Sequence, residues 1–404
     1  MKIKQITAII AGMLMLAAGP GLVQAQEKDQ PVRIGAIADL SGAYSGLAGP
    51  GIGVAMEMAV EDFGGQVLGR PIEVLIADSL LKVDVATSRA REWIDQQDVQ
   101  MILESSDSAS ALALQKLARE KKRVTVFTSG TTALINDECS PYGMQWVWNV
   151  YALANVTGKV LTQGGGKSWY FISADYAFGK ALQDETAKVV ERMGGEVVGS
   201  VAHPFKATDF ASFLLSAQSA NPDVIALANA GQDTQNAVRQ AREFGLTTGK
   251  TKVAPLILFD SDVKGMGLDL AQGLLFTTAF YWDRTPESRA WSERFYERRK
   301  LMPTMNQAGA YSATMHYLKA VEAAGTLDAD AVMEQMQKMP VNDFFTTDGL
   351  VRKDGMMVHD MYLAQVKSPD ESTGPWDMLT IQETISGDEA FPKLADSTCP
   401  LVKS

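Results

Sequence analysis

Short apolar runs alternate with longer segments in which apolar residues recur at helical spacing. In the first part of the chain the strand-like runs are residues 32–38, 72–77, 99–103 and 124–127. The helical segments between them are residues 52–63, a segment that begins at Asp84, and residues 108–119. Strands that alternate with helices over short connections predict a parallel sheet covered by helices on both faces.

A second series with the same alternation begins near Ser168. Its strand-like runs are residues 169–173, 196–201, 224–227 and 256–259, and its helical segments are residues 178–193, 209–220 and 234–244. The pattern predicts two Rossmann-like lobes of α/β architecture. No proline-rich linker separates the two series, so we expect several chain crossings between the lobes.

The pattern changes after Gln272. One more strand-like run is followed by helical segments, two short strand-like runs, and a polar tail: residues 274–280, 288–299, 308–324, 329–338, 350–352, 356–366 and 368–404. We expect the first lobe to comprise residues 31–149 and 281–345, and the second lobe residues 150–280 and 346–370. Residues 371–404 are expected to wrap back as a tail.

The first 25 residues differ from the rest of the chain. Lys2 and Lys4 precede an apolar run over residues 6–18, and a small residue, Ala25, ends the segment after Val23 and Gln24. A short basic segment followed by an apolar run too short to span a bilayer predicts a cleavable signal peptide. We expect cleavage after Ala25 and export to the periplasm.

The net charge excludes some classes of binding partner, and the cysteine content predicts a disulfide. The net charge of −11 with no basic stripe argues against nucleic acid and anionic membranes, and no apolar run after Ala25 is long enough for membrane insertion. The two cysteines, Cys139 and Cys399, favour a disulfide in an exported protein. Two unrelated buried thiols are the alternative.

Signatures of catalysis and of cofactors are weak. Residues 164–168 resemble a phosphate loop, but Leu161 stands where a glycine is needed and the run precedes a strand instead of following one. The three histidines, His203, His316 and His359, are far apart and show no metal-ligand spacing. We therefore expect a protein that is not an enzyme and holds no cofactor or metal, with a periplasmic enzyme as one competing reading.

Candidate binding residues lie in loops at the carboxyl ends of predicted strands, where open α/β sheets bind ligands. They are Tyr44, Asp107, Ser108, Ser129, Gly130, Thr131, Trp148, Tyr151, Tyr176, Phe178, Asn229 and Asp260. Some of these residues have a simpler interpretation. Asp107 and Ser108 fit a helix N-cap, the 128–132 run fits an ordinary turn, and Trp148 and Tyr151 fit hinge packing.

Several of these segments together resemble the branched-chain-amino-acid type of periplasmic substrate-binding protein of ABC transporters. The matching segments occur in the family's order, at residues 34–42, 105–108, 129–132, 175–179, 303–305 and 310–313. The resemblance extends over nearly the whole chain after the signal peptide. It implies the type I periplasmic binding protein fold, with two lobes joined by three crossings and a ligand enclosed between them.

The resemblance also implies roles for residues and partners. The first lobe is expected to grip a ligand α-carboxylate at the positions matching Asp107, Ser108, Gly130 and Thr131. Tyr176 and Phe178 match aromatic residues that close over the ligand, and Asp260 is the nearest match to an acidic residue that meets the ammonium group. The closed protein, expected to be a monomer, would dock on the permeases and ATPases of an ABC importer.

Asp107 departs from the family pattern, which tends to place a hydroxyl residue there. A carboxylate beside a ligand carboxylate is repulsive in a cleft of low dielectric constant. Either Asp107 points away as a helix cap, or the ligand is not a simple α-amino acid. The aromatic residues near the cleft leave room for an aromatic or alcohol-derived compound. A sensor that signals to a membrane receptor would have the same binding chemistry and is the other competing reading.

Overall fold

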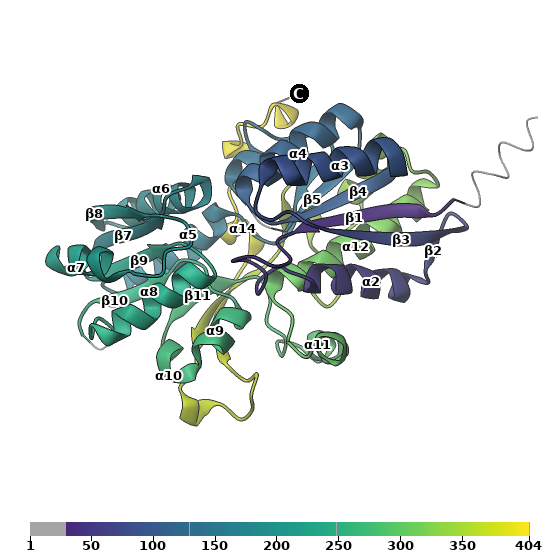
Figure 1. Cartoon of the computed structure of the whole chain (residues 1–404). Coiled ribbons are helices and arrows are strands. Elements are labelled where there is room, and N and C mark those ends of the chain that lie inside the picture. Colours follow the sequence, from purple (N-terminus) through teal and green to yellow (C-terminus); the bar gives the residue numbers. More distant parts are fainter. Residues whose placement is uncertain (1–29, 129, 248, 404) are drawn as a thin grey trace, which may run out of the picture.

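The computed structural model describes residues 30–128, 130–247 and 249–403, and the predicted signal peptide lies outside them. Two α/β lobes lie side by side (Figure 1). The first contains a six-stranded sheet in the order β2-β3-β1-β4-β5-β6. Its strands are β1 (Val32–Ala38), β2 (Gln66–Val67), β3 (Arg70–Asp78), β4 (Val99–Ser105), β5 (Val124–Phe127) and β6 (Gly143–Gln145). All neighbours pair in parallel except β2 and β3.

Helices from two distant parts of the chain cover the first sheet. They are α2 (Gly51–Phe63), α3 (Val83–Gln97), α4 (Ser108–Lys121), the 3-10 turn η1 (Thr132–Ile135), α11 (Pro286–Arg299), α12 (Met305–Ala324) and α13 (Ala329–Lys338). Thr304 begins α12 with a capping box formed with Gln307, and its hydroxyl donates to the Leu47 carbonyl at 2.7 Å. This contact holds α12 against the loop that precedes α2.

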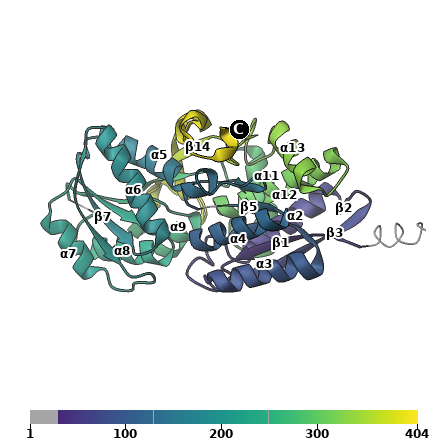
Figure 2. The same ribbon diagram turned by 90° about the horizontal axis from the view of Figure 1, so that it is seen from above.

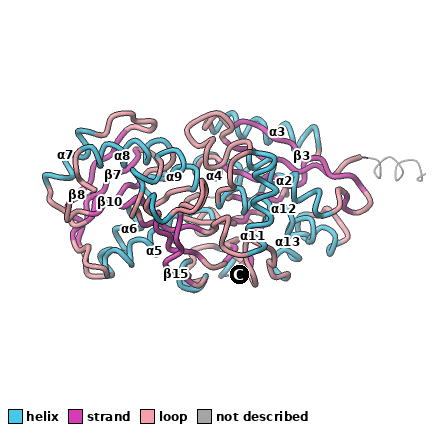
Figure 3. The backbone as a smooth tube through the Cα atoms, turned by 90° about the horizontal axis from the view of Figure 1, so that it is seen from below, coloured by secondary structure: helices cyan, strands magenta, loops and turns pink. Residues whose placement is uncertain are grey.

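The second lobe contains a four-stranded parallel sheet in the order β10-β9-β7-β8. Its strands are β7 (Ser168–Ala174), β8 (Glu196–His203), β9 (Val224–Ala228) and β10 (Lys252–Pro255), and its helices are α5 (Val150–Gln163), α6 (Ala177–Arg192), α7 (Ala211–Ser219), α8 (Gln232–Glu243), α9 (Asp260–Met266) and α10 (Leu268–Ala271). In both lobes the strands run between helices (Figure 3). The strand predicted at 256–259 lies instead at 252–255, and these four residues pair with β9.

A third, antiparallel sheet flanks the second lobe. It has the order β11-β14-β15, with β11 (Leu275–Thr278), β14 (Met361–Val366) and β15 (Leu379–Ile385). Phe276, Ala364, Val366 and Leu379 pack into a hydrophobic cluster of the second lobe. The predicted boundaries differ here. β15 is a paired strand of this sheet, whereas the sequence pattern predicts a wrapping tail for all of residues 371–404.

The segment between α13 and β14 lies with the first lobe and not, as predicted, with the second. It forms the short hairpin β12 (Leu350–Val351) and β13 (Met357–Val358). The Gln145 amide of β6 donates to the Gly355 carbonyl at 2.9 Å, so the turn of the hairpin lies against the edge of the first sheet. Backbone hydrogen bonding to an edge strand thus outweighs the continuity of the sequence with β14.

The chain passes between the lobes before α5, after β11 and before β14, and its C-terminal part returns once more. That part contains η2 (Pro369–Glu371), α14 (Gly387–Ala390), η3 (Leu394–Asp396) and η4 (Pro400–Val402). Cys399 forms a disulfide with Cys139 across 260 residues, with the two Cα atoms 5.7 Å apart. The predicted disulfide is confirmed, and the C-terminal segment lies beside the junction of the lobes (Figure 2).

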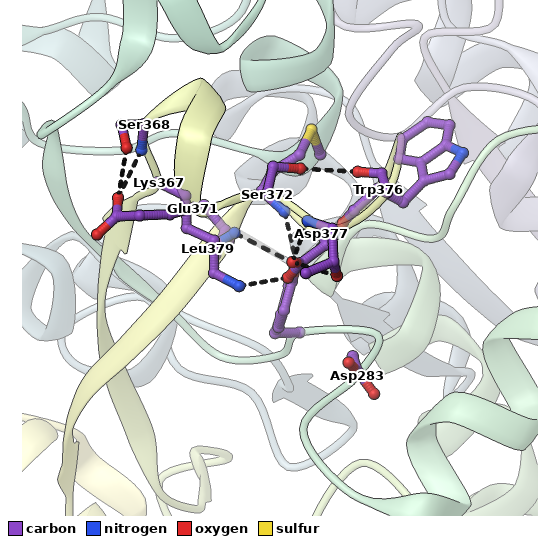
Figure 4. Close-up of polar contacts among 12 residues, drawn as sticks. Asp283, Lys367, Ser368, Glu371, Ser372, Trp376, Asp377 and Leu379 are labelled. Atoms are coloured by element: carbon purple, nitrogen blue, oxygen red, sulfur yellow. Dashed lines mark hydrogen bonds and ion pairs between the residues drawn. The ribbon is translucent and has the colours of Figure 1, made fainter.

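The connection between β14 and β15 is closed by its own polar contacts (Figure 4). Lys367 and Asp377 form an ion pair at 2.5 Å, and the Glu371 carboxylate accepts from the amide and hydroxyl of Ser368 at 2.8 and 2.9 Å. None of these four residues lines the cavity between the lobes. In the part of the chain that the structure describes, no helix combines the length and the apolar character needed to cross a membrane.

Candidate ligand-binding site between the lobes

Loops from both lobes enclose a cavity of about 30 Å³. Every loop follows the carboxyl end of a strand or opens a helix, the usual position of ligands in open α/β sheets. The cavity is lined by Tyr44, Leu47, Ser106, Asp107, Ser108, Gly130, Trp148, Tyr176, Phe178, Ala230, Ile257 and Phe259.

Asp107 begins α4 and lines the cavity at the same time. Its Oδ1 accepts from the amides of Ala109 and Ser110 at 2.9 and 3.0 Å, and its Oδ2 accepts from the Ser110 hydroxyl at 2.7 Å. Both oxygens are therefore engaged in capping the helix, as the simpler reading of this residue predicted. Asp107 nevertheless also lines the cavity.

Glu104, near the end of β4, lies directly behind this turn and is buried. Its Oε1 accepts from the amides of Ser106 and Asp107 at 2.7 and 3.2 Å, and from the Ser106 hydroxyl. Burial, and next the charge of Asp107, raise the pKa of Glu104 to about 8. This carboxyl therefore holds its proton at neutral pH, and the amides before α4 bind a carboxyl group of the protein itself.

Tyr44 from the first lobe and Tyr176 from the second place their hydroxyl groups in hydrogen-bond contact across the cavity. The Tyr44 loop is held by Asp39, whose carboxylate accepts from the Gly42 and Tyr44 amides, both at 2.8 Å. Burial raises the pKa of both tyrosines above the usual value, so both hydroxyls are neutral. They can donate or accept hydrogen bonds but contribute no charge.

Aromatic rings form another part of the wall. Trp148 meets Phe178 edge to face with centroids 6.0 Å apart, and Phe178 lies 6.0 Å from Tyr176. Phe205 packs behind the pair of tyrosines, 5.6 Å from Tyr44 and 5.2 Å from Tyr176. The Trp148 indole N–H donates to the Asn306 side-chain oxygen at 2.9 Å, which fixes the orientation of the indole ring.

The structure brings seven of the predicted site residues to this cavity: Tyr44, Asp107, Ser108, Gly130, Trp148, Tyr176 and Phe178. Ser129 lies outside the described residues. Thr131, Tyr151, Asn229 and Asp260 do not line the cavity.

Each of these last four residues has a local environment outside the cavity lining. The Thr131 side chain caps η1, and Tyr151 lies in the first turn of α5. The Asn229 amide is buried between the His203 ring at 3.0 Å and the Thr234 hydroxyl at 2.8 Å. Asp260 is buried in the first turn of α9, and this burial raises its pKa to about 7. The contact of Asp260 with a ligand ammonium group, which the resemblance implies, stays a prediction.

Sequence reasoning missed Leu47, Ser106, Ala230, Ile257 and Phe259, which also line the cavity. Ser106 could have been found, because it belongs to the same polar run as Asp107. Ile257 and Phe259 lie in the run predicted as a strand, and apolar side chains there carry no signal that separates a cavity wall from a core. No group of His, Cys, Asp or Glu suited to a metal ion occurs among the residues that the structure describes.

The chain resembles known proteins over most of its length. The family model described as "Periplasmic binding protein" matches residues 31–374. A periplasmic binding protein from Burkholderia mallei is 46% identical, with 92% of this chain and 99% of that chain covered and a TM-score of 0.90. A branched chain amino acid ABC transporter periplasmic ligand-binding protein from Burkholderia xenovorans is 36% identical, with 92% and 100% covered and a TM-score of 0.84.

A more distant structure shares the fold. It is a solute binding protein of an ABC transporter from Rhodopseudomonas palustris in complex with 3,4-dihydroxy benzoic acid, 21% identical, with 88% of this chain and 98% of that chain covered and a TM-score of 0.80. No curated protein matches the chain. The family match over most of the chain, the two parallel-sheet lobes and the cavity between them show that this chain belongs to the periplasmic binding proteins, a family of binding proteins and not of enzymes.

Proposed function

We propose that the chain is the solute receptor of an ABC importer in the periplasm. It captures one small organic molecule, an amino acid or an aromatic compound, between its lobes and delivers that molecule to the permease. The observation that carries this proposal is the cavity lined by both lobes, in which Tyr44 and Tyr176 meet from opposite sides.

The size of the cavity supports a hinge-bending trap. A volume of about 30 Å³ corresponds to roughly two water molecules, so a larger ligand enters only when the lobes separate or the tyrosines turn. Closure then buries the ligand against both walls. A ligand drives closure only through its higher affinity for the closed state.

Two relatives support the ligand classes. One carries the description of a branched chain amino acid receptor, and the other was solved with 3,4-dihydroxy benzoic acid. The aromatic wall formed by Trp148 and Phe178 suits the apolar body of either class.

The test is a thermal-shift screen of the mature protein against amino acids, aromatic acids, amines, amides, alcohols and polyols. A ligand that binds only the folded state raises the melting temperature as its concentration exceeds the dissociation constant. We expect a saturable increase with at least one of these classes and unchanged recovery of the compound after incubation. Conversion of the compound would instead support an enzyme. No stabilisation by any class would contradict the receptor proposal.

A further inference from the structure

Most backbone amides of the turn before α4 already donate hydrogen bonds to carboxyl groups of the protein itself. The amides of Ser106 and Asp107 donate to Glu104, and those of Ala109 and Ser110 donate to Asp107. A helix N-terminus is a natural seat for an anion because its amides lack partners within the helix. Here the carboxyl groups of Glu104 and Asp107 already accept hydrogen bonds from these amides.

The lining contains no cation that could pair with a bound anion. Among the twelve residues that line the cavity there is no lysine, arginine or histidine, and Asp107 is the one acidic residue. A ligand carboxylate in this cavity would be desolvated beside Asp107 without a counter-charge. Burying an unpaired charge in this way costs several kcal/mol.

A second carboxylate lies near the same corner. Asp233 is 3% exposed, and its charge acts on both Tyr44 and Tyr176. Its Oδ2 accepts from the Lys206 amide at 3.1 Å, whereas its Oδ1 is buried without a hydrogen-bond partner in the described structure. Burial raises the pKa of Asp233 to about 6, while the charge of Lys206 acts to lower it.

The rings at this corner suit a cation as well. The Phe205 ring centre lies 5.6 Å from that of Tyr44 and 5.2 Å from that of Tyr176. Phe178 and Trp148 continue the wall. Four of these rings, those of Tyr44, Tyr176, Phe178 and Trp148, line the cavity, and an aromatic face attracts a positive charge most strongly when the charge is desolvated. Lys206, whose ammonium lies 5.4 Å from the Phe205 ring centre, is exposed and is not part of the lining.

We propose that the ligand presents a positively charged amine or ammonium group to the corner formed by Asp107, Tyr44 and Tyr176. Ligands whose only charged group is a carboxylate are rejected there. The proposal rests on the receptor function and specifies the chemical class of its ligand. The net charge of −11 favours the approach of such a cation.

The experiment compares probes with matched carbon skeletons by calorimetry on the mature protein. One set is benzylamine, benzamide and benzoate, and the other is 3-methylbutylamine, leucine and 4-methylpentanoate. We expect at least one amine to bind at least tenfold more tightly than the carboxylate of its set. Equal or tighter binding of the carboxylates, or no binding of both amines, overturns the cation proposal. The receptor function fails separately, when no compound of the wider screen binds.

Asp107→Asn isolates the contribution of the charge, because asparagine also caps helices well and the turn should keep its shape. We expect it to weaken amine binding about tenfold or more without weakening benzoate binding. The matched control is Asp328→Asn, since Asp328 caps α13 through the Ala331 amide at 3.0 Å and does not line the cavity. The control should leave amine binding unchanged. Amine affinity that is unaffected by Asp107→Asn overturns the role of this carboxylate.

Discussion

Tyr44 and Tyr176, which are 132 residues apart in the sequence, join their hydroxyl groups across the cavity between the lobes. Tyr44 is fixed to the first lobe by the loop that follows β1, and Tyr176 is fixed to the second lobe at the start of α6. The contact therefore exists only when the lobes are together. A ligand that enters the cavity must separate these hydroxyls or bind to both.

The first prediction concerns the Tyr176 ring. Tyr176→Ala removes the ring contacts with Phe178 and Phe205 as well as the hydroxyl, and aromatic contacts of this kind contribute about 0.5–1.5 kcal/mol each. We expect the affinity for the ligand found in the screen to fall about tenfold or more, as measured by calorimetry. Tyr176→Phe keeps the ring and should lose less. Unchanged affinity in the alanine variant would remove Tyr176 from the site.

The second prediction concerns Glu104 and pH. Burial raises the pKa of Glu104 to about 8, whereas the unfolded chain has the ordinary value near 4.5. Between these values the folded state binds the extra proton, so the contribution of Glu104 to stability is largest at low pH and is lost as pH rises toward 8. Each tenfold change in proton affinity corresponds to about 1.4 kcal/mol.

Glu104→Gln should flatten this dependence. We expect the melting temperature of the wild-type protein to fall more between pH 5 and pH 8 than that of the variant, as measured by differential scanning calorimetry. Glu120→Gln, an exposed change on the same α4, is the control and should follow the wild type. Parallel curves for Glu104→Gln and the wild type would show that Glu104 is not the group that titrates.

The third prediction concerns the disulfide. Because it closes a loop of 260 residues, replacing Cys139 and Cys399 with serine should destabilise the protein by roughly 2–4 kcal/mol and loosen the C-terminal segment. Urea unfolding of the two proteins measures the loss, and limited proteolysis reports the loosened segment. Reducing agent should lower the stability of the wild type but not that of the double variant. Alkylation of both cysteines in unfolded, unreduced protein would contradict the bridge.

The fourth prediction concerns the ion pair of Arg352 and Asp354. The guanidinium and carboxylate lie 2.6 Å apart, with side-chain exposures of 13% and 1%, and Arg352 also donates to the Pro392 carbonyl at 2.6 Å. Arg352→Met leaves a buried carboxylate without its cation and should destabilise the protein by about 3–5 kcal/mol in urea unfolding.

The matched comparison is the exposed ion pair of Lys338 and Glu334, whose side chains are 60% and 62% exposed. Lys338→Met should change the stability by less than about 1 kcal/mol, because water screens this pair. The double variant Arg352→Met with Asp354→Asn should recover part of the loss. Equal effects of the two methionine variants would show that burial of the Arg352 pair does not matter.

Much of the fold could be predicted from local pattern. The apolar run of β4, which is buried throughout, and the capping residues of α4 and α12 carry their structure in a few neighbouring positions. The predicted boundaries were wrong at 350–358, where Met356 pairs with the distant Gln145, and at β15, which pairs with the preceding strand β14 across a polar connection. Nothing local in a short polar or mixed run specifies its partner strand.

The site divides in the same way. Tyr44, Asp107 and Tyr176 could be named from their positions after predicted strands, since the carboxyl ends of parallel strands converge. The raised pKa of Glu104 could not be foreseen, because it depends on complete burial next to Asp107. Asp260 is equally suitable in the sequence, but in the structure it is buried in the first turn of α9 and does not line the cavity.

By itself, the sequence determined the two series of strands and helices, the cysteine pair and the polar loops that carry most of the site, because periodicity, capping and turn chemistry act over a few residues. The tertiary structure decided which loops meet, which carboxyl groups are buried, and that the donors before α4 already bind the protein's own carboxyl groups. These properties depend on desolvation and on contacts between residues that only folding brings together.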